Sequence, residues 1–430
     1  MTTPPTVELS EWDAVERPGA RLSPADRTAA WALKSSKRLD IDELRDGVRI
    51  VARGWIGVVR LESCTVRVRP TLVNGHRGLV KILQYVRRLS LVKWMREKAP
   101  FVADDVDWVD LMAWLLADAC DDVLRAGPQA DYVWQRDELR VLRGRIDAKA
   151  QVLRRFGRVD TIICEFDERT SAIAGNPWLV RGLTASRRGV GDQAVRDRVS
   201  RACTAWSEVC RDDPSEPLPK PELTRATVHY RDALELAYLL IDGLGASDLL
   251  MPGVVAGRSF LLNMPRLFEE LVGHLVREIG SANSLDVAAQ HREESVLWDP
   301  DLNRRFGSVR PDLLVESRDR QIRIPIDAKY KDYGHQKLKQ GDLYQGALYA
   351  ATLARPPKGR LPTCLMFYPA QDATARPQRV QVRVNGVGTA EVVVMGLPME
   401  DLLHRLPHPN LESTMASAPW QAELMELVAT

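Results

Sequence analysis

The sequence predicts a multidomain protein of the mixed α+β and α/β class, and three patterns along its 430 residues indicate this. Apolar and polar residues alternate in about the first hundred residues, which is typical of strands. Apolar residues then recur at helical spacing, and from about residue 255 the order is helix, strand, strand, helix, strand. We therefore expect a β-rich domain over 1–100, a helical segment over 101–245, and an α/β domain with a C-terminal extension over 246–430.

In the first part, two apolar runs over 49–59 and the alternating run 66–70 predict strands. A helix should follow them, with one apolar face made of Leu79, Ile82, Leu83 and Val86. The helical middle part has an equivalent core stripe of Trp108, Leu111, Met112 and Leu115. The polar segment 211–221 contains four prolines and predicts a loop, and a helix is expected around 227–242.

The third part contains a predicted β-hairpin. Two apolar runs, 310–315 and 322–329, are separated by the short polar segment 317–320. Pro325 lies inside the second run and removes a backbone donor, so we expect that strand to be an edge strand or to be bulged there. Further strands are predicted at Cys364–Tyr368, Val380–Val384 and Val392–Val394.

Polar side chains gather at the ends of this hairpin. Asp312 begins the first run, and the second run ends in Asp327-Ala328-Lys329, so hairpin pairing would bring Asp312 beside Asp327. Asp327 and Lys329 project from one face because side chains alternate along a strand. Two carboxylates suit Mg²⁺ or Mn²⁺, which bind through oxygen, and such an ion polarises a phosphate and acidifies a bound water. The pattern predicts metal-dependent phosphodiester hydrolysis, with Lys329 orienting the water or stabilising charge.

A second Asp-x-Lys at Asp147-Ala148-Lys149 has no Pro-Asp at hairpin distance upstream. We interpret it as a solvated turn or strand end.

A helix should begin after Asn263, which can cap it, with Pro265 in the first turn. Its buried stripe is predicted to be Phe268, Leu271, Val272, Leu275 and Ile279. Glu270 lies opposite that stripe and is expected to face water. Glu269 lies on its flank, either as a third metal ligand and catalytic residue or as an ordinary glutamate favoured by the helix dipole.

Composition excludes several classes of protein. The net charge is +2, so any DNA affinity must come from a local patch such as Lys329, Lys331, Lys337 and Lys339. The six cysteines show no C-x-x-C pair, which argues against a zinc site and favours a reducing compartment. With no signal peptide pattern and no apolar run of membrane-spanning length, we expect a cytoplasmic protein. No phosphate-binding G-x-x-x-x-G-K-[ST] loop is present, so we expect the chain to bind no nucleotide.

The hairpin resembles the signature of the PD-(D/E)xK nuclease superfamily, whose core has a restriction-endonuclease-like α/β fold. Downstream, Asp342, Gln345 and Tyr349 share one helix face. The Gln-x-x-x-Tyr pair is similar to an extra motif of RecB-like nucleases. That resemblance implies that Gln345 and Tyr349 help to position DNA; alternatively the pair is a polar helix face. Lys331, as part of the basic patch, is also expected to position DNA.

Four stretches in order resemble the McrC family, the nuclease subunits of McrBC modified-cytosine restriction systems. They are the hairpin 53–59 with 68–70, the segment 164–170 with Asn176 and Leu179, the helix 260–272, and the block from Pro311-Asp312 to Gln345. The chain departs from the family at Arg69-Pro70-Thr71, where a lysine usually follows the proline.

The resemblance implies a partner and an activity. McrC-like proteins dock through their N-terminal part onto a ring of AAA+ McrB-like GTPase subunits, stimulate GTP hydrolysis, and cut double-stranded DNA carrying modified cytosine. A restriction and antiviral defence endonuclease is thus expected. One alternative is a non-cutting subunit that activates an NTPase or bridges DNA, although the complete set Asp312, Asp327 and Lys329 argues against it. The other is a stand-alone DNA repair nuclease, which the large N-terminal region without chemistry of its own disfavours.

Overall fold

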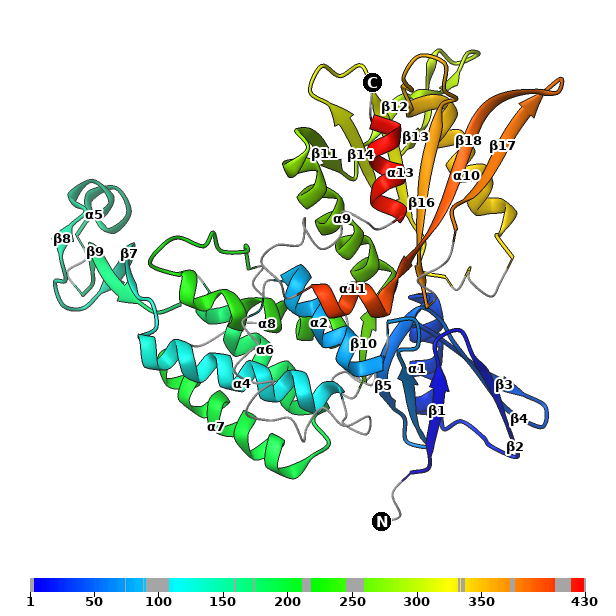
Figure 1. The fold of residues 1–430 in the computed structure, drawn as a ribbon. Coiled ribbons are helices and arrows are strands. Elements are labelled where there is room, and N and C mark those ends of the chain that lie inside the picture. The colour runs from blue at the N-terminus through cyan, green and yellow to red at the C-terminus, as the bar shows by residue number, and fades with distance from the viewer. Residues whose placement is uncertain are drawn as a thin grey trace. The chain divides into compact units, whose positions relative to one another are not determined.

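The computed structural model describes residues 4–73, 75–87, 89, 108–157, 160–172, 175–210, 218–244, 259–331, 333, 337–371, 376–406 and 419–428. The chain folds as two compact units, Met1–Val106 with Leu261–Thr430, and Asp107–Phe260 (Figure 1). Residues 211–217 of the predicted proline-rich loop lie outside the described part. Within the described residues, no helix is long and apolar enough to cross a membrane.

The N-terminal part of the first unit is built from strands, as predicted. Among the described residues one sheet has the order β1-β6-β5-β10 and a second the order β2-β4-β3. Their bounds are β1 Thr6–Ser10, β2 Ala14–Pro18, β3 Leu39–Leu44, β4 Gly47–Ala52, β5 Trp55–Arg60, β6 Thr65–Arg69 and β10 Ser259–Asn263. Helix α1 spans Pro24–Ser35 and α2 spans Gly75–Arg87. The predicted apolar face of α2 is buried, from Leu79 to Val86.

The remainder of the first unit is centred on a mixed sheet. Its order in the described chain is β11-β14-β15-β16-β18-β17. The strands are β11 Leu285–Ala289, β14 Leu313–Ser317, β15 Arg323–Ala328, β16 Thr363–Ala370, β17 Gln378–Val384 and β18 Val387–Pro398. A separate ribbon pairs β12 Glu293–Asp299 with β13 Arg304–Val309. The helices are α9 Met264–Ala282, α10 Gln340–Leu353, α11 Met399–Arg405 and α13 Pro419–Val428.

Helices cover both faces of this sheet (Figure 1). In α10, a Cβ added at Gly346 would lie within 3.4 Å of Val392 and Met366, so this helix packs closely on their face. Phe367 follows Met366 and therefore points to the opposite face, where its ring meets Trp420 of α13 at a centroid distance of 5.8 Å. The sheet is thereby buried on both sides.

The predicted hairpin is confirmed, but the expectation for Pro325 is wrong. Strand β15 lies inside the sheet, between β14 and β16, and Pro325 pairs with Leu314 in regular register. Its missing N–H would point toward β16. There the ladder begins only at Ile326, after a separate bridge between Arg323 and Arg355. Because no ladder partner faces Pro325 on that side, an interior proline is tolerated without a bulge.

The second unit contains the predicted helices. They are α4 Trp108–Ala126, α6 Asn176–Gly189, α7 Gln193–Val209 and α8 Arg231–Leu244, with a short 3₁₀ turn at Val228–Tyr230. The predicted stripe from Trp108 to Leu115 is buried.

The middle part is not helical throughout, however. The described residues between 131 and 170 form a lobe of three strands and one helix, namely β7 Asp131–Leu139, β8 Arg145–Ile146, α5 Ala148–Arg155 and β9 Ile162–Thr170. Strand β7 is exposed along almost its whole length, so no alternation of buried and exposed residues marked it in the sequence.

A buried polar network fastens this lobe to the helices of its unit. Asn176 and Tyr230 are 0% and 1% exposed. The Asn176 amide donates to the carbonyls of Gln129 and Ser171 at 2.8 Å, which lie just outside the two ends of the lobe. The Tyr230 hydroxyl donates to Asn176 Oδ1 at 2.7 Å and accepts from the Gln129 N–H at 2.7 Å. The buried polar groups of Asn176 and Tyr230 thus find partners, and the chain enters and leaves the lobe at a fixed point.

One buried carboxylate links the N-terminal strands to the larger sheet of the first unit. Glu11, which follows β1, is 4% exposed and accepts a hydrogen bond from the Tyr330 hydroxyl at 2.9 Å. Burial raises the pKa of Glu11 from 4.5 to about 7, although hydrogen bonds from Thr71 and Tyr330 oppose the shift. Burial and the nearby Glu11 raise the pKa of Tyr330 well above 10, so its hydroxyl remains the donor.

This raised pKa predicts a pH-dependent stability. A protonated Glu11 stabilises the fold below about pH 4.5, and this contribution is lost as the pH rises through about 7. As the pH rises between these two values, the free energy of unfolding of Glu11→Gln should therefore increase relative to that of wild type by up to about 3 kcal/mol. Thermal unfolding midpoints of both proteins across this range measure the effect. Glu8→Gln, which changes a more exposed carboxylate of β1, should follow the wild-type curve, and parallel curves for Glu11→Gln would contradict the prediction.

Candidate active site

The hairpin brings together the three polar residues that the sequence placed at its end. Leu313 pairs with Ile326, so Asp312 and Asp327 come opposite each other at the next position. Asp312 Oδ2 accepts a hydrogen bond from the Ala328 N–H at 2.7 Å. Lys329 Nζ lies 2.8 Å from Asp327 Oδ2. The two carboxylates and the ammonium therefore form one cluster.

Burial sets the charge state of this cluster. Asp327 is 1% exposed because β15 is an interior strand. Burial, with the charge of Asp327, raises the pKa of Asp312 to about 7. Burial also raises the pKa of Asp327, although Lys329 opposes the shift. Burial alone would lower the pKa of Lys329, but the two aspartates outweigh it and raise that pKa. The two acids thus repel each other where little water screens them, and one cation only partly compensates.

The donor set fits a hard divalent cation. Asp327 Oδ2 is buried, and apart from the ion pair with Lys329 it has no hydrogen-bond donor among the described residues. Carboxylate oxygens without histidine or cysteine are what Mg²⁺ and Mn²⁺ prefer. No three His, Cys, Asp or Glu side chains in the described part are gathered closely enough to hold a metal by themselves. Asp312 and Asp327 are therefore the core of a candidate metal site that needs oxygens from elsewhere.

Glu269 interacts electrostatically with this cluster, although the described structure does not gather it with the two aspartates into a three-ligand group. It lies in α9, and burial raises its pKa, with Lys329 lowering and Asp327 raising it further. Both groups are therefore within electrostatic range of Glu269. The expected N-terminus of α9 is confirmed, since Asn263 accepts from the Arg266 N–H at 3.1 Å and Pro265 lies in the first turn. The predicted buried stripe of this helix is also confirmed.

The expectation that Glu270 faces water is wrong. Its side chain is 26% exposed, and its carboxylate lies 2.8 Å from Arg87 of α2 and 3.4 Å from Arg266. Helix α2 packs against α9, so the side of α9 opposite the sheet is covered. A helical periodicity alone cannot show a second packing partner.

Two polar residues of the downstream helix α10, Gln345 and Tyr349, form hydrogen bonds that hold the start of the hairpin. Tyr349 is 5% exposed, and its hydroxyl donates to the Arg310 carbonyl at 2.9 Å. Gln345 Nε2 donates to the same hydroxyl at 2.7 Å. The pair therefore holds the chain two residues before Asp312. Neither residue was expected from the sequence to contact that carbonyl, because residues 310 and 349 are far apart in the chain.

Lys331 is fixed by an ion pair. Its ammonium lies 2.5 Å from Asp342 Oδ2, which also accepts from the Tyr333 hydroxyl. The sequence analysis did not identify Tyr333 as a site residue. Its place two residues after Lys331 could have indicated that it shares a polar partner with that lysine. Lys337 and Lys339 are exposed just before α10. Because Asp342 of α10 is paired with Lys331, the start of this helix lies near the hairpin end, and the two exposed lysines precede it in the chain.

The second Asp-x-Lys motif has a structural role. Asp147 caps α5 by accepting from the Ala150 N–H at 2.9 Å, and it pairs with Arg136. Lys149 is exposed. The motif thus lies where the two-residue strand β8, which pairs with β9, ends and α5 begins, in agreement with the predicted strand end.

The chain is similar to known proteins in its sequence and in its fold. The family described as "McrBC 5-methylcytosine restriction system component" matches residues 50–369. One similar chain comes from a solved half-complex, taken from a tetradecameric assembly of Thermococcus gammatolerans McrB AAA+ hexamers with bound McrC. The TM-score is 0.54 and the sequence identity 15%, and the match covers 91% of this chain and 94% of the solved chain. A chain of the Thermococcus gammatolerans McrBC complex gives a TM-score of 0.43 and 17% identity, over 64% and 88% of the two chains. A search of curated proteins found no match. The chain thus has a McrC-like mixed α/β fold with several sheets.

The candidate metal site predicts which residues control metal affinity. Asp312→Asn and Asp327→Asn should each weaken Mn²⁺ binding by about tenfold or more, because each removes a charged oxygen ligand. Glu269→Gln tests the role of a third ligand, which predicts a weaker Mn²⁺ affinity for this variant too. Isothermal titration calorimetry measures the affinities. Asp147→Asn retains the helix cap and should bind Mn²⁺ as wild type does, and equal affinities for all four variants would refute the site.

Proposed function

Because the chain belongs to the family of McrBC 5-methylcytosine restriction system components, we propose that it is the DNA-cutting subunit of such a system. The observation that supports this most directly is the placement of Asp312, Asp327 and Lys329 at one end of a buried hairpin. A family member built only to bind would not need two buried, mutually repelling carboxylates beside a lysine.

The larger sheet with α9 and α10 is proposed to be a PD-(D/E)xK nuclease core. In this proposal the carboxylates of Asp312 and Asp327 would hold Mg²⁺, and that of Glu269 would complete the set. The bound ion would polarise the scissile phosphate and lower the pKa of a water molecule. Lys329, held by Asp327, stabilises the charge that develops on the phosphate and orients the attacking water. Tyr349 and Gln345 keep Asp312 in place through the Arg310 carbonyl.

The proposed substrate is double-stranded DNA carrying modified cytosine. Lys337 and Lys339 are exposed just before α10, and the Tyr344 ring on this helix is 69% exposed. Cations of this kind bind the phosphate backbone without reading sequence, so recognition of the modified base is assigned to a partner. The overall charge of +2 agrees with a local rather than a global DNA surface.

The proposed partner is a ring of McrB-like AAA+ GTPase subunits, since the similar solved complex contains McrB AAA+ hexamers with bound McrC. Docking through residues 1–100, which the family resemblance implies, is one proposal. Among the described residues of this part, Trp31 on α1 is the most exposed large apolar side chain, at 71%.

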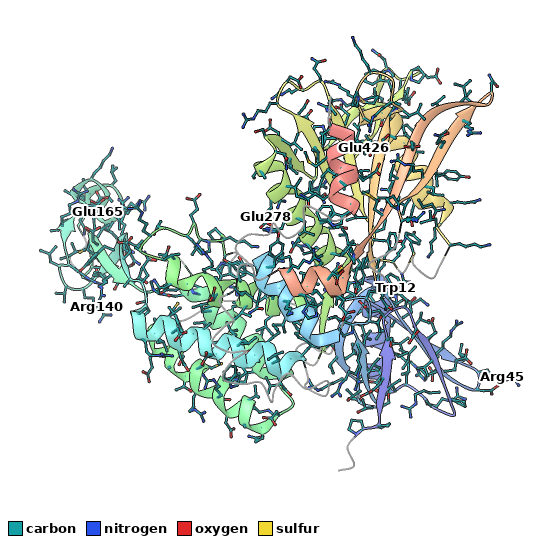
Figure 2. The ribbon with its side chains drawn as sticks, in the orientation of Figure 1. Trp12, Arg45, Arg140, Glu165, Glu278 and Glu426 are labelled. Atoms are coloured by element: carbon teal, nitrogen blue, oxygen red, sulfur yellow. The ribbon has the colours of Figure 1, made fainter. Side chains whose placement is uncertain are left out.

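The lobe of residues 131–170 exposes more large apolar side chains than the described part of residues 1–100. Nine large apolar side chains of the described lobe residues are exposed, including Phe156 at 85%, Leu153 at 74% and Trp134 at 55%. Figure 2 shows that the side chains of the lobe, where Arg140 and Glu165 are labelled, point outward around it. Exposed aromatic and aliphatic groups of this density are typical of a binding surface, so we propose the lobe as the main docking element.

The cleavage proposal predicts the effect of three substitutions. Asp312→Ala, Asp327→Ala and Lys329→Ala should each slow DNA cleavage by about a thousandfold or more, because each removes transition-state stabilisation. The measurement is the cleavage rate of methylcytosine-containing DNA with the cognate ring, GTP and Mg²⁺. Lys149→Ala is the matched control and should cut normally.

Metal removal gives a further check on the same reaction. EDTA should stop cleavage, and added Mg²⁺ should restore it. If wild type and Asp312→Ala both fail to cut while each still stimulates GTP hydrolysis, the chain is the non-cutting activator instead. Full cleavage in excess chelator would refute the metal-dependent reaction.

The docking proposal predicts which surface the ring contacts. Phe156→Ala should raise the concentration needed for half-maximal GTPase stimulation by about tenfold, because an exposed aromatic anchor is lost. Trp31→Ala should leave it unchanged, and the chain alone should hydrolyse neither GTP nor ATP. The opposite result would place docking on residues 1–100. Deletion of residues 1–100 is not a clean test, because β10 and α9 pack against this segment.

A further inference from the structure

A buried hydrogen bond connects the N-terminal strands to the chain just after β15, where Lys329 and Tyr330 lie. Tyr330 directly follows Lys329, and its hydroxyl donates to Glu11 Oε2 at 2.9 Å. The two side chains are 3% and 4% exposed. Because Glu11 follows β1, this bond joins the N-terminal sheet to the residue next to the candidate catalytic lysine.

The carboxylate of Glu11 is itself held by the ends of two strands. Its Oε2 also accepts from the Thr71 N–H at 3.0 Å and the Leu72 N–H at 3.5 Å. These residues follow β6, which pairs with β1 in parallel. The position of Glu11 therefore depends on how β1 and β6 lie together, and a shift of either strand would reach Tyr330.

A second connection joins the same sheet to α9. Strand β10 lies beside β5 and runs directly into this helix, whose first N–H, on Met264, donates to the Gly54 carbonyl at 3.0 Å. A Cβ at Gly54 would lie 2.8 Å from Pro265 and 2.9 Å from Trp12, which Figure 2 labels at this junction. Only glycine fits there, so the start of α9 is fixed against the N-terminal strands.

The two connections meet beside the active site. The rings of Phe268 and Tyr330 are packed with their centroids 5.8 Å apart. Phe268 precedes Glu269, and Tyr330 follows Lys329. Packing of these two rings therefore ties the helix that carries Glu269 to the strand that carries Lys329.

We propose that Glu11 and Tyr330 are positioning residues that couple the N-terminal sheet to the active site by fixing Lys329 for cleavage. The inference rests on the proposed nuclease function and adds a route by which a movement of the N-terminal sheet alters cutting. Neither residue contacts the substrate. Their effect passes through the backbone of Lys329, whose N–H donates to the Phe367 carbonyl at 2.8 Å.

The test separates this coupling from simple stability. Tyr330→Phe keeps the ring packing and removes only the hydroxyl, and Glu11→Ala removes the acceptor. Each should lower kcat for motor-driven cleavage about ten- to a hundredfold, because a small misplacement of a catalytic group has effects of this size. The KM for DNA and the stimulation of GTP hydrolysis should stay at wild-type values. Glu11→Gln retains an acceptor and should restore most of kcat.

Two comparisons make the result specific. If both residues act through one hydrogen bond, the double variant should cut no more slowly than the single variants. Tyr85→Phe is the matched control, because Tyr85 of α2 packs on His274 of α9, another contact of the same segments. Wild-type kcat in Tyr330→Phe, multiplying effects in the double variant, or a loss of GTPase stimulation in step with kcat would each overturn the proposal.

Failure of the nuclease proposal is distinguishable from failure of this one. If wild type cuts no faster than Asp312→Ala, the proposed function is wrong, and hydrogen exchange then tests the coupling alone. Exchange of the Lys329 amide should speed up in Glu11→Ala and Tyr330→Phe but not in Tyr85→Phe. Unchanged exchange in the first two variants would overturn the coupling itself.

Discussion

The register between β14 and β15 is the constraint on which the candidate active site depends. With Leu313 opposite Ile326, Asp312 and Asp327 face each other and Lys329 shares their side of the sheet. A slip by one residue would turn Asp327 to the other face, away from Asp312. The turn fixes this register, because the Ser317 N–H donates to the Ile322 carbonyl at 3.1 Å and Arg320 adopts a left-handed conformation with φ of 57°.

Burial raises the pKa values of the two aspartates that this register places side by side. An interior strand with helices on both faces of its sheet excludes water from Asp327, so the two carboxylates repel strongly and their pKa values rise. Groups that are costly to bury in this way need cations or donors close by. Lys329 supplies one cation, and Tyr349 stabilises the preceding turn through the Arg310 carbonyl. The support extends beyond the sheet, since Glu11 belongs to the N-terminal strands and still reaches Tyr330.

Sequence reasoning succeeded where a feature is encoded by neighbouring residues. The hairpin, the Asn263 cap and the buried stripe of α9 follow from periodicity and local hydrogen bonding. It failed where a distant segment decides the outcome. Pro325 is tolerated in an interior strand because Arg355 and β16 leave its position without a ladder partner, and Glu270 is covered because α2 packs on α9. Strand β7 was missed within the segment predicted to be helical because it is exposed along almost its whole length and no distant segment of the described chain buries one of its faces.

The sequence by itself determined the pair of apolar runs, the turn between them, and the Asp-x-Lys at their end, because strand alternation and turn chemistry act over a few residues. It thereby determined which aspartates and which lysine form the candidate site. Only the tertiary structure decided what holds them. The Glu11–Tyr330 bond joins residues 319 positions apart, and the Tyr349–Arg310 bond joins residues 39 apart. No local pattern encodes such contacts, because they arise only when separate elements pack and their buried polar groups must find partners.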